Sequence, residues 1–423
     1  MQTPRERLRL SLNHQEPDQV VVDLGSTAIT GIAASALHRL RERLNLPSKT
    51  IRIHEPFQLL GFVDQDVVQA LGCDVLGIWS AYDMFGYSNE KWKSWQLFDG
   101  TPVFISEELV FSEDSGGNIY LHPAGDSQNP PCAKLPQGGY YFDVLVRQNQ
   151  KVPQGGKEDF AEQYSVYSDE ECRFYEDQSR YLFENTDFGL IGMLSGGSLG
   201  DIAHVPGPNL AYPQGIRDPM DWYVAHKLNP EYIKDVFAYQ TEIALKNAEL
   251  YWQAVGSRIE AIVISGTDFG TQRSEFISPD TFRDLYKPFF QKINHWIHKN
   301  TTWKTFYHTC GSIVNLLDDL ADCGVDILNP VQCSAAGMEP KFLKEKYGDR
   351  FVFWGGGVNT QHTLPFGNPN DVRDEVLERL QIFSPGGGYI FSAIHNIQAP
   401  TSVDNILAIF EAVNLFRKEQ QSI

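Results

Sequence analysis

The stretch "KTFYHTCGSIVNLLDDLADCGVDILNPVQ", residues 304–332, contains the repeating unit of the fold. Residues 304–310 and 325–332 are short apolar runs, as expected of buried strands, and the amphipathic run between them predicts a helix that ends at Gly324. A strand, a helix and a second strand in this order are typical of a parallel βαβ unit. This stretch therefore predicts two parallel strands joined by an external helix.

The same alternation continues on both sides of this unit. Amphipathic patterns follow the apolar runs, with Ser, Asn or Pro at their starts and Gly after their ends. The predicted strands are 19–25, 74–81, 188–197, 260–268, 304–310, 325–332, 351–358 and 388–396. Eight such strands predict an α/β fold, a single (β/α)8 TIM barrel that forms one domain over residues 1–423. A doubly wound open sheet is the alternative, but no glycine fingerprint follows the first strand.

The alternation fails between residues 82 and 187. "TPVFISEELVFSEDSGGNIYLHPAGD" (101–126) has period-two alternation around "DSGGN", which predicts an antiparallel hairpin. We therefore expect residues 82–187 to form an insertion after the second strand, an antiparallel and loop subregion over the mouth of the barrel. A peripheral or oligomer-forming role for this insertion is equally open.

Composition excludes several classes of function. The 423 residues contain 35 Lys and Arg against 54 Asp and Glu, a net charge of −19, which repels nucleic acid and anionic lipid. No apolar run reaches the roughly 20 residues of a membrane helix, and the N-terminal residues are charged where a secretion signal is apolar. The six scattered cysteines are typical of reduced thiols. We therefore predict a cytoplasmic protein without a nucleic-acid or membrane partner.

Chemistry-bearing side chains gather at the C-terminal ends of the predicted strands, where barrel enzymes have their active sites. His308 and Cys310 are two residues apart, so their side chains point to the same side of a strand. Zinc accepts His and Cys together in a tetrahedral site, and a catalytic site leaves one position for substrate. His308, Cys310 and His395 are the predicted ligands, with Gln332 or Cys333 as an additional one. Packing or hydrogen bonding is the alternative role for such residues.

Three segments carry a resemblance to a known family. "HTCGSIVNLLDDLADCGVDILNPVQ" (308–332), "GDRFVFWGGGVNTQHTLPFGNPNDVRDEV" (348–376) and "GGGYIFSAIHNIQAPTSVDNILAIFEA" (386–412) resemble the uroporphyrinogen decarboxylase superfamily, whose members are (β/α)8 barrels. The resemblance covers residues 185–418 well and the first eighty residues loosely. It implies one of two chemistries: metal-free decarboxylation of a tetrapyrrole, or zinc-dependent methyl transfer among thiols, methoxy or methylamine-type donors and corrinoid proteins.

The two branches differ after the first strand. The decarboxylases have an Arg-rich segment there, of the form R-Q-A-G-R-Y, that holds the carboxylates of the substrate. Here "VVVDLGSTAITGI" (20–32) contains no Arg. The zinc methyltransferases carry H-x-C at the end of strand five, which His308 and Cys310 match. Two departures are Gln332 and Cys333, where a ligand such as Glu is usual, and His395, where Cys is usual; a neutral imidazole makes the site less anionic.

The resemblance thus implies a zinc-dependent methyltransferase that moves a methyl group between a small methylated substrate or thiol and a corrinoid protein. In that reading Asp268 is a general acid or orienting base, and Gln272 and Asn329 are polar positioning groups. These three side chains equally suit backbone hydrogen bonds at strand ends. A decarboxylase-like lyase, a non-catalytic corrinoid or small-molecule-binding barrel, and a phosphosugar enzyme using "WGGGV" (354–358) remain alternatives. The sequence leaves the methyl donor, the direction of transfer and a homodimer open.

Overall fold

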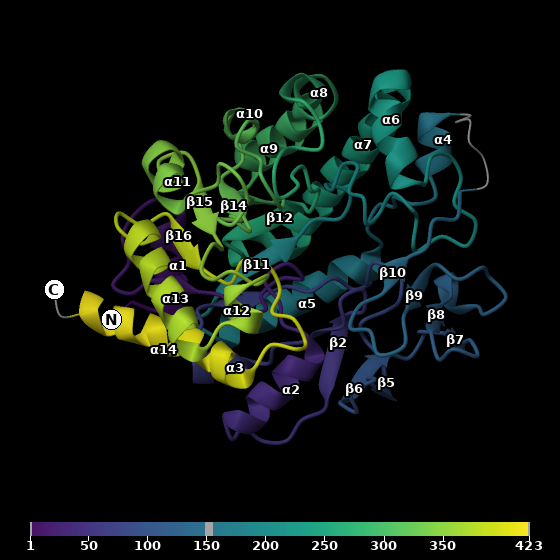
Figure 1. Cartoon of the computed structure of the whole chain (residues 1–423). Coiled ribbons are helices and arrows are strands. Elements are labelled where there is room, and N and C mark those ends of the chain that lie inside the picture. The colour runs from purple at the N-terminus through teal and green to yellow at the C-terminus, as the bar shows by residue number, and fades with distance from the viewer. Residues whose placement is uncertain (1, 149–154, 422–423) are drawn as a thin grey trace.

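The computed structural model describes residues 2–148 and 155–421. Its main sheet has the order β1-β16-β15-β14-β13-β12-β11-β4, and every neighbouring pair is parallel (Figure 1). The strands are β1 (Val21–Val22), β4 (Val75–Gly77), β11 (Gly189–Met193), β12 (Ala261–Ser265), β13 (Lys304–His308), β14 (Ile327–Asn329), β15 (Val352–Trp354) and β16 (Tyr389–Phe391). Each lies inside one of the eight predicted ranges, so the predicted (β/α)8 barrel is confirmed.

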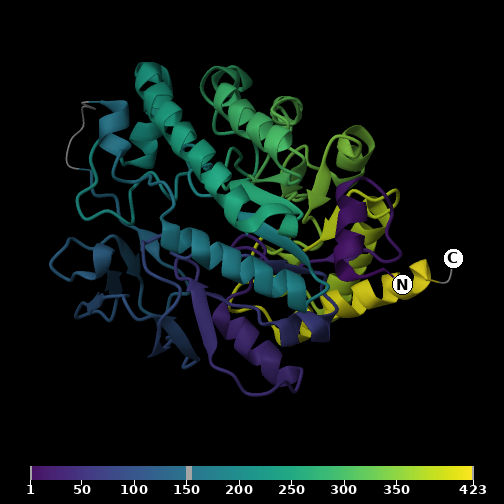
Figure 2. The ribbon, with the colours of Figure 1, turned by 180° about the vertical axis from the view of Figure 1, so that it is seen from behind.

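Helices surround the sheet, and the N- and C-terminal segments lie on the same side of the molecule (Figures 1 and 2). Ser and Asn caps begin helices where the sequence predicted them, including Ser278 before α8 and Asn368 before α13. The larger helices are α1 (Pro4–Leu12), α2 (Ala34–Arg43), α5 (Asp169–Asn185), α6 (Pro219–Leu228), α7 (Pro230–Val255), α9 (Lys287–Asn300), α11 (Pro340–Tyr347), α13 (Pro369–Phe383) and α14 (Val403–Gln420). The shorter ones are α3 (Gln65–Leu71), α4 (Gly156–Phe160), α8 (Pro279–Leu285), α10 (Leu317–Asp322) and α12 (Thr363–Phe366).

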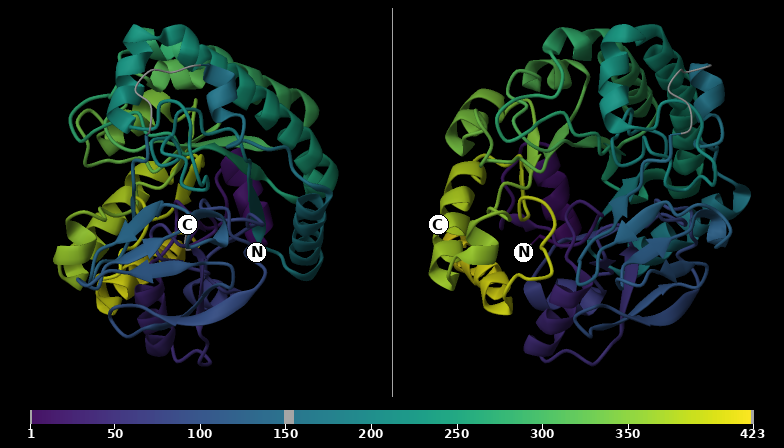
Figure 3. Two further views of the ribbon diagram at one scale, coloured as in Figure 1. Left: turned by 90° about the vertical axis from the view of Figure 1, so that its right-hand side faces the viewer. Right: turned by 45° about the vertical axis from the view of Figure 1, so that its right-hand side comes forward.

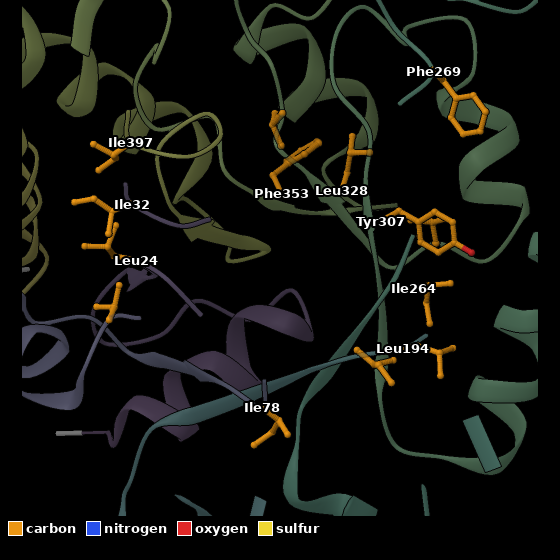
Figure 4. Close-up of a cluster of buried hydrophobic side chains, with 14 of the residues drawn as sticks. Leu24, Ile32, Ile78, Leu194, Ile264, Phe269, Tyr307, Leu328, Phe353 and Ile397 are labelled. Atoms are coloured by element: carbon orange, nitrogen blue, oxygen red, sulfur yellow. The ribbon is translucent and has the colours of Figure 1, made fainter. Parts of the chain in front are cut away.

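The strands are apolar on both faces because both faces are buried. On the helix side, Tyr307 meets Phe290 of α9, and Phe353 meets Phe383 of α13. Figure 4 shows Tyr307 and Phe353 within this buried apolar cluster. Alternate residues point into the barrel and form a second cluster, to which α1 contributes Leu8 and Leu12. This inner cluster contains Val21, Val75, Ile191, Ala261, Val263, Phe306, Ile327, Val352, Trp354 and Ile390. The interior below the strand ends is therefore packed, and Ser265, His308 and Asn329 lie at the C-terminal ends of their strands.

The seam between β1 and β4 is held by one buried carboxylate. The N–H of Asp74 donates to the carbonyl of Val22 at 2.8 Å, and the N–H of Val22 donates to Asp74 Oδ2 at 2.8 Å. Asp74 is fully buried and also pairs with Arg7 and Arg417. A side chain thus takes the place of the strand ladder that would otherwise close the barrel.

The predicted insertion is an extensive β region that has one unforeseen partner. β7 (Phe111–Glu113), β8 (Ile119–Leu121), β9 (Ala133–Leu135) and β10 (Asp143–Val144) form an antiparallel sheet whose first turn contains the predicted "DSGGN". The second sheet has the order β3-β2-β6-β5, formed by β2 (Ile51–Glu55), β3 (Leu60–Gly61), β5 (Trp92–Gln96) and β6 (Pro102–Ser106). β2 and β3 belong to the connection after β1. The insertion therefore shares a sheet with residues that precede it, beside the barrel (Figure 3).

The end of the range 82–187 belongs to the barrel. We predicted no α/β unit there, but α5 is a seventeen-residue helix that packs against α7 and leads into β11. Its sequence is strongly charged, and among its residues only Tyr175 and Ser179 are buried, which explains why the pattern was weak. Among the described residues, no helix has the length and apolar character needed to cross a bilayer.

Two carboxyl groups inside the β region make the stability depend on pH. Glu55 accepts the N–H groups of Phe57 and Gln58, and Asp83 accepts those of Phe85 and Tyr87. Burial raises the pKa of both carboxyls to about 7, and the charge of Glu55 adds to the rise for Asp83. Both folded-state pKa values exceed the ordinary carboxyl pKa near 4 of an unfolded chain. The stabilisation of the fold by the two protonated carboxyls is therefore complete below about pH 4 and is lost as the pH rises toward 7.

Asp83→Asn is expected to remove part of this loss, because the amide still accepts hydrogen bonds but never becomes charged. The free energy of unfolding of the variant minus that of the wild type should rise by about 1–2 kcal/mol from pH 5 to pH 8, as measured by urea denaturation. Asp114→Asn is the control: hydrogen bonds from Asn118 lower the pKa of that carboxyl to about 2, so it is ionised throughout. A wild-type pH dependence in Asp83→Asn would contradict the assignment.

Candidate metal centre

Three of the predicted ligands lie together at the C-terminal end of the barrel. His308 ends β13, Cys310 follows it by two residues, and His395 lies four residues beyond β16. Donor atoms of all three lie within 4.8 Å of one another, and the two imidazole rings are edge to face with centroids 5.2 Å apart. The barrel thus brings together residues that are 85 positions apart in the sequence.

Hydrogen bonds fix the proton on His308. Asn329 donates from Nδ2 to the carbonyl of Trp354 at 2.8 Å, so its Oδ1 faces His308 Nδ1 at 2.5 Å as an acceptor. Nδ1 therefore carries the proton, and Nε2 presents its lone pair toward Cys310 Sγ at 3.2 Å. Metal-binding histidines are held by this kind of outer hydrogen bond. Asn329, predicted as a positioning group, lies in position to orient the imidazole.

His395 is held in a different way. Its φ of +72° lies in the left-handed region that side chains other than Gly rarely adopt, and such strain clusters at functional sites. Burial, followed by the neighbouring His308, lowers the pKa of His395 to about 3, so the ring is neutral. The N–H of Asn396 donates to His395 Nδ1 at 2.8 Å. A neutral ring that bound a metal through Nδ1 would lose this hydrogen bond directly. A neutral ring that bound it through Nε2 would carry its proton on Nδ1 and would lose the bond as well. His395 is therefore the weaker imidazole donor.

Two carboxylates lie beside the thiol of Cys310. Asp268, at the end of the predicted strand 260–268, accepts the Cys310 N–H at 2.7 Å, and its Oδ1 is 3.7 Å from His308 Nε2. Asp201, which the sequence did not single out, lies in the loop after β11. Burial raises the pKa of the Cys310 thiol well above its ordinary value, and the charges of Asp268 and Asp201 add to the rise. A bound cation would offset this accumulation of negative charge.

Gln332 and Cys333 do not join the three donors. Gln332 Oε1 accepts the N–H of Gly311 at 2.8 Å and so braces the loop that carries Cys310. The Cys333 thiol donates to the carbonyl of Val331, and among charged groups it lies near Arg379 and Glu375 of α13. Burial raises the pKa of this thiol to about 12. In this structure Gln332 therefore braces the loop of Cys310, and Cys333 faces α13.

Gln272 also lies away from the three donors. Its exposed side chain donates from Nε2 to Gln361 Oε1 at 3.1 Å, so it joins the loop after β12 to the loop after β15 at the rim. The predicted catalytic set of Asp268, Gln272 and Asn329 is thus divided in space. Asp268 and Asn329 contact the cluster of His308 and Cys310, whereas Gln272 links two rim loops.

The donor set suits zinc. One imidazole with a preset lone pair, one thiol and a second neutral imidazole are the ligand types that zinc binds, and three protein donors leave a fourth position. The spacing of 3.2 Å between His308 Nε2 and Cys310 Sγ is close to the edge of a tetrahedral zinc site. The residues present therefore fit a zinc ion.

Comparison with known proteins supports the same relationship. Residues 220–416 match the family model of uroporphyrinogen decarboxylase (URO-D). The methylcobamide:CoM methyltransferase MtaA of Methanosarcina barkeri is 26% identical over 185 residues, which cover 40% of this chain and 50% of that protein. The chain thus matches about half the length of this curated relative.

A solved structure extends the comparison to the whole chain. A methyltransferase from Methanosarcina mazei has 17% sequence identity and a TM-score of 0.55, with 98% of this chain and 99% of that chain covered. At this identity the likeness shows the fold alone. The uroporphyrinogen decarboxylase match over residues 220–416 confirms the predicted resemblance to the uroporphyrinogen decarboxylase superfamily, and the similarity to MtaA fits its methyltransferase-like branch.

Proposed function

We propose that the protein is a zinc-dependent methyltransferase that moves a methyl group between a small methylated substrate or thiol and a corrinoid carried by a partner protein. The observation that carries this proposal is the convergence of His308, Cys310 and His395 with the lone pair of His308 Nε2 turned toward Cys310. When bound, zinc supplies a Lewis acid that stabilises a thiolate or polarises the atom from which a methyl group leaves.

The residues of the chain have distinct roles in this proposal. His308, Cys310 and His395 hold the metal, and Asn329 keeps His308 in the tautomer that can bind it. Asp268 fixes the loop of Cys310 through the N–H of that residue. The inner Met193 and Ile29 pack against the barrel cluster but are only partly buried, so apolar groups border the strand ends. A small methyl compound matches such surroundings.

The segment after β1 argues against the decarboxylase alternative. The decarboxylases carry an Arg-rich motif in this segment, whereas residues 20–32 of this chain contain no Arg. The Asp23 carboxylate of the segment accepts hydrogen bonds from Ser26 and from Trp354 Nε1 at 2.9 Å. Asp23 is buried, and burial raises its pKa to about 6. Without a guanidinium group in this segment, a polycarboxylate lacks the clamp that would bind it.

A cysteine nucleophile is a second candidate, because Cys310, His308 and Asn329 are hydrogen-bonded in the order of a Cys–His–Asn triad. Acyl transfer also requires backbone N–H groups free to bind an oxyanion. Here the N–H of Cys310 donates to Asp268 and that of Gly311 donates to Gln332. The nearest N–H groups are therefore occupied, which favours the metal centre.

The zinc-loaded protein is expected to transfer methyl groups and to leave uroporphyrinogen unchanged. Incubation with methylcobalamin and a panel of small thiols, followed by loss of the methylcobalamin absorbance, tests transfer to a thiol. A panel of methoxy and methylamine compounds with reduced cob(I)alamin tests the reverse direction. Uroporphyrinogen under reducing conditions should release no CO2, because the segment after β1 has no arginine clamp. Stepwise decarboxylation would overturn the proposal in favour of the lyase.

A further inference from the structure

Protein zinc sites are almost always four-coordinate, and the three donors described above leave one position to be filled. We propose that the Asp268 carboxylate is the fourth donor of this centre and the one that substrate displaces. The inference rests on the proposed function, since it concerns the same metal. The sequence predicted the additional ligand after β14, at Gln332 or Cys333. The proposal places it after β12 instead, at Asp268.

The distances around His308 carry the proposal. With Zn–N and Zn–O bonds of about 2.0–2.1 Å and Zn–S of about 2.3 Å, neighbouring donors of a tetrahedral site lie roughly 3.3–3.6 Å apart. His308 Nε2 is 3.2 Å from Cys310 Sγ and 3.7 Å from Asp268 Oδ1. The thiol lies about 0.1 Å below this range and the carboxylate about 0.1 Å above it, so small shifts would let both share a tetrahedral metal with this nitrogen.

The setting of Asp268 also matches that of a ligating carboxylate. The Cys310 N–H donates to its Oδ1 at 2.7 Å, which places this oxygen beside the thiol as an outer hydrogen bond does in metal sites. Among the described residues, its only ion-pair contact is with His308. Its side chain is 33% exposed, whereas that of His308 is 4% exposed. The Asp268 carboxylate is thus the more accessible of the two groups and the one that can exchange with an incoming ligand.

The chain offers a matched control in Asp201. This carboxylate accepts the N–H of Ala203 at 2.9 Å, and its Oδ2 lies 3.3 Å from where a Cβ on Gly266 would be. It interacts electrostatically with both Asp268 and His308, yet no atom of it contacts His308 or Cys310 in the described hydrogen bonds and ion pairs. Replacing Asp201 by Asn removes the same charge from the same region, so the two variants separate a ligand from a background charge.

The test measures metal binding in the full-length protein. Asp268→Asn is expected to weaken zinc affinity by at least about tenfold, whereas Asp201→Asn should change it by less than about twofold. In the Co²⁺-substituted protein, Asp268→Asn should alter the visible ligand-field bands while keeping the thiolate-to-cobalt absorption of Cys310. Addition of a small thiol should bring the wild-type and Asp268→Asn spectra to the same end point, because the thiol takes the place of the carboxylate. Asp268→Glu should retain most of the affinity.

Three outcomes overturn the inference. Equal weakening by Asp268→Asn and Asp201→Asn would show a charge effect without ligation, and unchanged affinity and spectrum in Asp268→Asn would show no interaction with the metal. In both cases a wild-type protein that binds zinc and transfers methyl groups keeps the proposed function intact. A wild-type protein that binds no zinc overturns the proposed function and this inference together.

Discussion

Cys310→Ser is expected to lose most of its zinc while remaining folded. The thiol is the one sulfur donor among the three gathered residues, and exchange for a hydroxyl removes the ligand that zinc binds most strongly there. The purified wild type should contain about one equivalent of metal, and the variant less than about a tenth of that, with affinity lowered by about 100-fold or more. The fold should persist, because the two apolar clusters of the barrel do not include Cys310.

Two variants sharpen this expectation. Cys333→Ser is the matched control. The Cys333 thiol faces α13, so its replacement should change neither the metal content nor the affinity for zinc. His395→Ala should have an intermediate effect, because coordination by His395 must first break the hydrogen bond from the Asn396 N–H. Wild-type affinity should fall as pH falls, since protons compete with the metal for Cys310 and His308. Full metal content in Cys310→Ser would remove the thiol from the centre.

The barrel was predictable because its strands are buried on both faces. Each strand therefore reads as a continuous apolar run, a signal that survives without any knowledge of the tertiary structure. The pairing of β2 with β6 joins residues on either side of β4, and no local pattern contains that information. The helix α5 was missed because its largely exposed, acidic sequence lacks a wide apolar stripe.

The site was predictable only where regular strand geometry continues to the functional residue. His308 and Cys310 follow β13 directly, so alternation placed both on one side. After β14 the chain turns through Pro330 and Val331, whose φ of +58° breaks the alternation, and Cys333 points toward α13. Asp201 lies eight residues beyond the last residue of β11, in an irregular loop. Its approach to Asp268 is a property of the folded chain alone.

Asp74→Ala is expected to be among the most destabilising single substitutions in this barrel. The fully buried carboxylate accepts hydrogen bonds from Arg7 at 3.0 Å and from Arg417 at 2.6 Å, and those two side chains are 11% and 8% exposed. Removal of the carboxylate leaves the Arg417 guanidinium in the interior without its anion and Arg7 with only the longer pair to Asp18 at 3.8 Å, and breaking a buried pair in this way typically costs about 3–5 kcal/mol. It also frees the Val22 N–H at the seam between β1 and β4.

Asp74→Asn should lose nearly as much as Asp74→Ala, although it keeps the shape of the side chain. All the hydrogen-bond partners of the Asp74 carboxylate are donors, so an amide NH2 in its place would face at least one N–H donor without an acceptor. The control is Glu411→Ala, which breaks the surface pair of Arg373 and the 61% exposed Glu411 and should cost less than about 1 kcal/mol. Urea denaturation followed by circular dichroism measures all three. If Asp74→Ala lost no more stability than Glu411→Ala, the seam would have to be held by the packing of α1 against β1 and β4, and the buried carboxylate would have no part in closing the barrel.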